Sequence, residues 1–77
     1  MPSLDQLAAG QRARIKGYNK GDPLLLRRLV EMGLNRGLLV EVKRFAPMGD
    51  PMEVVVRGYQ LSVRRKEAAL IEVEMVN

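Results

Sequence analysis

The residue types that most often carry chemistry are scarce in this sequence. It contains no histidine and no cysteine, which removes the usual general base, the commonest transition-metal ligand and the thiolate nucleophile. Its side-chain hydroxyls are Ser3, Ser62, Tyr18 and Tyr59, and no histidine is present to activate them. No P-loop, zinc-protease or hydrolase nucleophile motif occurs. We therefore expect no enzymatic activity and no cofactor.

Two carboxylates lie close together around a proline-flanked turn. Asp50 and Glu53 offer oxygen ligands that suit a hard cation. An aspartate in a turn more often accepts hydrogen bonds from the backbone of that turn, and this is what we expect of Asp50. Without imidazole or thiolate ligands, tight binding of iron by this chain alone is not expected.

The remaining candidates for function are binding residues, and the first group lies on a predicted helix. Asp22 is a suitable N-cap, Pro23 fits the first helical position, and Gly33 can end the helix in a left-handed conformation. At about 100° per residue, the positions that form one apolar arc are Leu25, Leu26, Leu29, Val30 and Met32.

Leu24 falls outside that apolar arc, among Arg27 and Arg28. It either packs against a neighbouring loop or forms a partner-binding face with the two arginines. A second exposed apolar residue is expected at Met48, near the tip of the loop Ala46–Pro51. Met48 either folds back on the sheet or anchors a partner, as adaptable methionine side chains do.

Short strands precede and follow the helix. Alternating apolar residues predict strands over residues 11–18, 38–45, 52–57, 59–63 and 71–76. A short turn is expected over residues 3–7, capped by Ser3. A helical turn or two is expected over residues 64–70, capped by Ser62. In the last strand Ile71, Val73 and Met75 should face inward. This pattern indicates a small, curled antiparallel sheet.

Composition restricts the partners. The length of 77 residues predicts a single domain, and the net charge of +4 is compatible with an acidic partner. If the first and last strands pair, Arg12, Arg14 and Lys16 face Glu72 and Glu74, and this basic stripe is largely neutralised. Arg57, Arg64 and Arg65 are expected to line an edge near Met48. Only three aromatic residues are present, which is few for stacking on bases.

The N-terminus does not resemble a signal peptide, and no apolar segment approaches the ~20 residues that span a bilayer. We expect a cytoplasmic protein with no membrane insertion and no nucleic-acid partner. The sequence is also compatible with weak association between copies of the chain.

Three segments resemble the FeoA family of ferrous iron transport proteins. Residues 28–37 read R-L-V-E-M-G-L-N-R-G, residues 45–51 read F-A-P-M-G-D-P, and residues 61–68 read L-S-V-R-R-K-E-A. The match extends over nearly the whole chain with its spacing intact. The resemblance implies a mostly β fold: one FeoA-type SH3-like barrel over residues 1–77, with five to six strands, one main helix and short helical turns.

The resemblance also implies a function. FeoA-type proteins are accessory to ferrous iron uptake, and the expected partner is the cytosolic region of the FeoB membrane permease. The expected partner-binding residues are Leu24, Arg27, Arg28, Leu29, Met48, Asp50 and Arg57. Leu29 also belongs to the predicted core. The alternatives are a small basic barrel that binds RNA or the ribosome, and a domain that senses metal directly.

Overall fold

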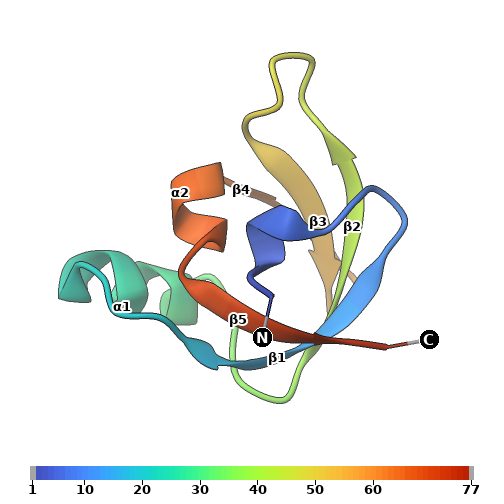
Figure 1. The fold of residues 1–77 in the computed structure, drawn as a ribbon. Helices are drawn as coiled ribbons and strands as arrows, with labels where there is room; N and C mark the ends of the chain where they lie inside the picture. Colours follow the sequence, from blue (N-terminus) through green and yellow to red (C-terminus); the bar gives the residue numbers. More distant parts are fainter. Residues whose placement is uncertain (1, 77) are drawn as a thin grey trace.

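Five antiparallel strands form one curled sheet, with helical segments packed beside it (Figure 1). The computed structural model describes residues 2–76. Along the sheet the strand order is β4-β3-β2-β1-β5. The strands are β1 (Arg12–Tyr18), β2 (Leu39–Phe45), β3 (Met52–Val56), β4 (Tyr59–Val63) and β5 (Ile71–Met75). The helical segments are η1 (Leu4–Gln6), α1 (Pro23–Glu31) and α2 (Arg65–Ala68). The predicted mostly β fold is confirmed.

The core follows from the alternation along the strands. In β3, Met52, Val54 and Val56 are buried while the residues between them are partly exposed, and β1 buries Ala13 and Ile15 in the same way. Because alternate residues of a strand point to the same face, one face of the sheet forms the apolar interior. Leu4, Leu29, Leu34 and Ala68 of the helical segments and their turns complete it.

Helix α1 begins and ends with the predicted devices. The Asp22 side chain accepts a hydrogen bond from the backbone N–H of Leu24 at 2.9 Å, and Pro23 takes the first helical position. At the other end Gly33 has a φ of +97°. The N–H of Gly33 donates to the carbonyl of Val30, and the N–H of Leu34 donates to the carbonyl of Leu29. This pair of bonds is the Schellman motif.

The apolar arc of α1 is narrower than predicted. Only Leu29 is fully buried, and Val30 is 46% exposed. The reason is geometric: Val30 lies about 100° around the helix from Leu29, and α1 contacts the rest of the molecule along one narrow side, chiefly at α2. Met75 was also expected to face inward, but it lies at the end of β5 and is 42% exposed.

Helix α2 is a single turn that connects β4 to β5, the two outer strands of the sheet. Ser62 does not cap it, contrary to prediction; Arg64 is the N-cap residue. The buried Glu67 carboxylate accepts a hydrogen bond from the backbone N–H of Arg64 at 2.9 Å. Its other oxygen lies 3.6 Å from the Nε atom of Arg28 on α1. Glu67 therefore holds the start of α2 and joins it to α1.

A tyrosine joins β1 to the turn that follows α1. The hydroxyl of Tyr18 donates to the carbonyl of Leu34 at 2.6 Å. Burial raises the pKa of Tyr18, and the positive charge of Arg36 partly opposes this. The hydroxyl consequently stays protonated, and able to donate, over the neutral pH range.

We predict that Glu67→Ala lowers the free energy of unfolding by about 2 kcal/mol, because the N–H of Arg64 and the guanidinium of Arg28 lose their shared acceptor. Glu67→Gln keeps an amide oxygen for Arg64, so its loss is expected to be less than half as large. Urea denaturation of both variants measures the difference. Equal losses would show that the hydrogen bond to Arg64 is not the important contact.

Candidate partner-binding surfaces

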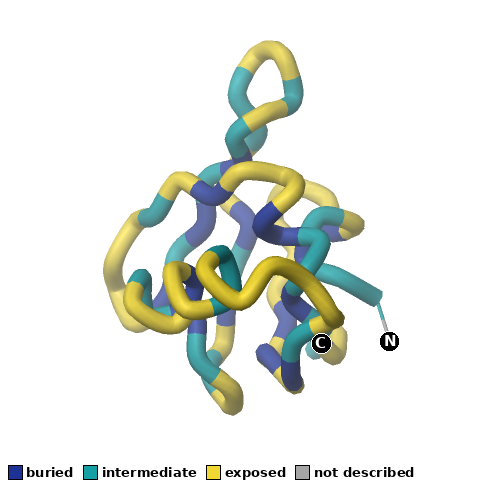
Figure 2. The backbone as a smooth tube through the Cα atoms, turned by 90° about the vertical axis from the view of Figure 1, so that its left-hand side faces the viewer, coloured by how far each residue is buried: buried dark blue, intermediate teal, exposed yellow. Residues whose placement is uncertain are grey.

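The first candidate surface is the outer side of α1. Leu24 is 75% exposed, so it does not pack against a neighbouring loop. Arg27 is exposed and lies 3.9 Å from Glu31, one turn further along the helix. Figure 2 shows α1 in front, mostly in the colour of exposed residues. Leu24 and Arg27 are thus exposed next to each other on the side of α1 that faces away from the barrel.

Two other predicted residues of this helix have structural roles. Leu29 is fully buried in the core, and Arg28 pairs with the buried Glu67. Replacing Arg28 would leave a buried carboxylate without its partner, which is costly. Leu24 and Arg27 are therefore the residues of the predicted face that take no part in the core or in the contact with α2.

The second candidate surface is the hairpin between β2 and β3. Met48 is 93% exposed at its tip and does not fold back on the sheet. Asp50 accepts a hydrogen bond from the backbone N–H of Arg65 at 3.0 Å. The prediction that Asp50 satisfies its own turn was wrong, because its carboxylate accepts one of the free N–H groups that begin α2.

Arg65 completes this attachment of the hairpin. Its Nε atom donates to the carbonyl of Gly49 at 2.7 Å, and its guanidinium lies 4.8 Å from the ring centroid of Phe45. Such stacking on an aromatic ring is a favourable cation–π contact. Arg65 is near the hairpin as predicted, and its role there is to hold the loop.

The two carboxylates considered as cation ligands have other partners. Glu53 lies 2.9 Å from the Nε atom of Arg44 and accepts from the side-chain amide of Gln60 at 2.6 Å. Asp50 bonds to Arg65. Within residues 2–76 there is no group of three or more acidic residues, histidines or cysteines able to hold a metal ion.

Arg57 lies in the two-residue turn between β3 and β4, at the opposite end of β3 from the hairpin. Both turn residues have positive φ, +54° at Arg57 and +82° at Gly58, as in a type I′ turn. The prediction that Arg57 lies near Met48 was therefore wrong: the length of β3 separates them. The predicted residues belong to three separate places, α1, the hairpin and this turn (Figure 1).

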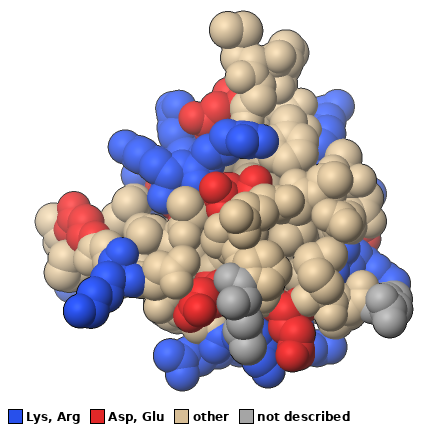
Figure 3. Space-filling model, in the orientation of Figure 1, with Lys and Arg blue, Asp and Glu red and all other residues tan. Residues whose placement is uncertain are grey.

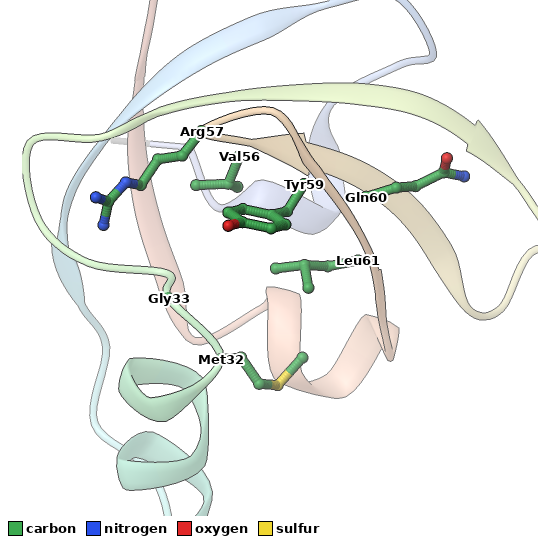
Figure 4. A pocket seen from close by; sticks show the side chains of 7 residues that line it. All are labelled: Met32, Gly33, Val56, Arg57, Tyr59, Gln60 and Leu61. Atoms are coloured by element: carbon green, nitrogen blue, oxygen red, sulfur yellow. The ribbon is translucent and has the colours of Figure 1, made fainter.

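Beside Arg57 is a groove that the sequence did not reveal. It has a volume of about 460 Å³ and lies between the end of α1 and the β3–β4 hairpin. Its lining residues are Met32, Gly33, Val56, Arg57, Tyr59, Gln60 and Leu61. Figure 4 shows the side chains of Met32, Tyr59 and Leu61 around one hollow, while Gln60 points away from it.

The basic stripe on β1 is largely engaged. Strands β1 and β5 pair as predicted, and Lys16 lies 3.8 Å from Glu74. Arg14 donates to the carbonyl of Gly37 at 2.7 Å. On the face drawn in Figure 3, acidic and basic side chains lie interspersed. Such a surface lacks the continuous positive charge that tracks a nucleic-acid backbone.

Comparison with known proteins identifies the chain. Residues 3–75 match the FeoA domain family. In Chlorobium tepidum, the solved structure of a FeoA protein is 43% identical, with a TM-score of 0.87 over 97% of this chain and 70% of that one. A zinc complex of FeoA from Stenotrophomonas maltophilia is 25% identical, with a TM-score of 0.82 over 96% and 91% of the two chains.

The Stenotrophomonas protein is described as an SH3 domain protein, so the present fold is an SH3-like barrel. The chain belongs to the FeoA family, which is linked to ferrous iron transport.

A further relative is the Fe(2+) transport protein A/Fe(2+) transporter FeoB fusion protein of Porphyromonas gingivalis. It is 35% identical over 74 residues, which are 96% of this chain. The chain spans about 9% of the fusion protein's length. None of the helices within residues 2–76 has the length and apolar character to cross a membrane.

We predict that Asp50→Ala loosens the hairpin and lowers the free energy of unfolding by about 1 kcal/mol, because the N–H of Arg65 loses its acceptor. Met48→Ser should change it by less than about 0.5 kcal/mol, since that side chain contacts mainly solvent. Urea denaturation and amide hydrogen exchange at Arg65 measure the effect. Unchanged exchange at Arg65 in the Asp50→Ala variant would contradict this role.

Proposed function

We propose that this protein is a cytoplasmic, non-enzymatic accessory protein of ferrous iron uptake that binds the FeoB permease and modulates it. The observation that supports this most strongly is the fusion protein of Porphyromonas gingivalis, in which a relative of this chain and the transporter share one polypeptide. Fusion holds two domains at a high effective concentration. In an organism that makes them separately, a specific contact serves the same purpose.

The outer side of α1 is the surface that we assign to this contact. Leu24 is 75% exposed, and an exposed leucine beside an arginine fits the apolar and cationic composition of binding hot spots. Neither Leu24 nor Arg27 supports the core. The net charge of +4 favours a partner with an acidic face. Met48 also lies outside the core, and it is a second candidate for contact with the permease.

The test is a binding titration of this protein against the purified cytosolic region of its organism's FeoB, with GDP and with a GTP analogue, at two salt concentrations. We expect saturable binding that weakens about tenfold or more in a Leu24→Ala, Arg27→Ala double variant, a loss typical of a small hot spot. The matched control is a Met75→Ala, Arg12→Ala double variant, which removes one exposed apolar residue and one arginine from β5 and β1.

Two results would contradict the proposal. If the cytosolic region and the full-length permease both fail to bind in either nucleotide state, the accessory role is wrong. If the control variant loses as much affinity as the α1 variant, the contact does not lie on α1. Steeply salt-dependent binding to RNA instead of the permease would support the alternative function.

A further inference from the structure

The two outer strands of the sheet differ in whether another segment of the chain covers their free edge. Strand β5 is covered: the N–H of Val73 donates to the carbonyl of Pro2 at 2.9 Å, and Ser3 forms a bridge with Glu72. Strand β4 pairs with β3 on one side only. Alternate residues of an outer strand direct their N–H and C=O groups away from the sheet, and in β4 these belong to the exposed Gln60 and Ser62.

The sequence of β4 does not protect this edge. Outer strands usually carry a charge or a proline that prevents pairing with another chain. Strand β4 reads Y-Q-L-S-V and has neither. A five-residue strand with a regular register to β3 thus offers an unprotected template for a further strand.

The groove described above runs along the same strand. Tyr59 and Leu61 face the interior side of the sheet, because they pair with the buried Val56 and Val54. Tyr59 is nevertheless 73% exposed, since the core ends before it, and the far side of the groove is lined by Met32 and Gly33 at the end of α1 (Figure 4). A strand added to β4 would direct alternate side chains into this hollow.

The charges at the ends of β4 indicate what kind of strand fits. Arg57 precedes the strand and Arg64 follows it, and within residues 2–76 neither forms an ion pair. Glu53, which pairs with Ser62 in the register of β3 and β4, is held by Arg44 at 2.9 Å. Positive charge therefore flanks both ends of the edge.

We propose that β4 binds an extended peptide segment of a partner protein by strand addition, and that this segment carries a large apolar side chain between acidic ends. The backbone of the segment pairs with Gln60 and Ser62, its apolar side chain enters the groove beside Met32, and its acidic ends meet Arg57 and Arg64. Strand addition of this kind combines main-chain hydrogen bonds with a side-chain pocket. This inference rests on the proposed function for the identity of the partner.

A second copy of this chain fits the edge less well. If β4 paired with β4 of another copy in antiparallel orientation, Arg57 of each copy would lie opposite Arg64 of the other. In parallel orientation each arginine would meet its own counterpart. Both arrangements place like charges together, which is unfavourable, whereas an acidic segment neutralises them.

The experiment uses a blocked nine-residue peptide with two glutamates at each end and a leucine at the centre of alternating valines and threonines. We expect saturable binding by calorimetry, with amide shifts in nitrogen-15 NMR at Gln60 and Ser62. The same peptide with N-methylated central amides, which cannot pair as a strand, should bind at least about tenfold more weakly. Replacing its glutamates with lysines should have a similar effect.

Protein variants complete the test. Arg57→Glu should weaken binding, while Lys20→Glu, the same charge change in the loop before α1, should not. Ser62→Pro should abolish binding, because proline removes an outward N–H while leaving the ladder to β3 intact. If the N-methylated peptide binds as tightly as the unmodified peptide, the proposal is wrong. This result is informative even if the Ser62→Pro variant fails to fold. Dimers that form through β4 would overturn it too.

Two results separate strand addition at β4 from the accessory role in iron uptake. If the FeoB cytosolic region binds the Ser62→Pro and Arg57→Glu variants as tightly as the unaltered protein, strand addition is wrong and the accessory role stands. If neither that region nor the full-length permease binds any form of the protein while the peptide still binds β4, the accessory role is wrong and the edge has another partner.

Discussion

The buried carboxylate of Glu67 is the interaction on which the arrangement of this small barrel depends. It accepts the N–H of Arg64 and pairs with Arg28, so it fixes the start of α2 and joins α1 to it. The adjacent N–H, that of Arg65, is accepted by Asp50 of the β2–β3 hairpin. The ion pair of Glu67 with Arg28 thus attaches α1 to α2, and the hydrogen bond from Arg65 to Asp50 attaches the hairpin, although these segments are far apart in the sequence.

This arrangement explains why one edge of the sheet stays open. Helix α2 is a single turn that spans from β4 to β5, so the curled sheet is completed by a helix and not by pairing of its outer strands. The N-terminal segment then covers β5, and no described segment covers β4. We assign two surfaces to partners, the outer side of α1 and the edge of β4. Neither surface takes part in the contacts that α2 makes with α1 and with the β2–β3 hairpin.

The sequence was informative wherever a local rule decides the structure. The helix α1 and the strands were predicted correctly. Asp22 and Pro23 mark the start of α1, Gly33 marks its end, and apolar residues alternate along the strands. Helix capping and the alternation of buried residues in a strand depend only on residues that are close together in the sequence. It failed where the partner is distant: Asp50 bonds to Arg65, fifteen residues further along the chain, and Arg28 pairs with Glu67. The groove was missed because alternation places Tyr59 on the inner face without showing that the core ends before it.

We assign two surfaces to a protein partner, the outer side of α1 and the edge of β4. The most direct test is an amide shift map of the nitrogen-15-labelled protein titrated with the FeoB cytosolic region. We expect the largest shift changes at two places, residues 24–27 on α1 and residues 60–62 on β4. Changes confined to β1 and β5, with α1 and β4 unaffected, would contradict it.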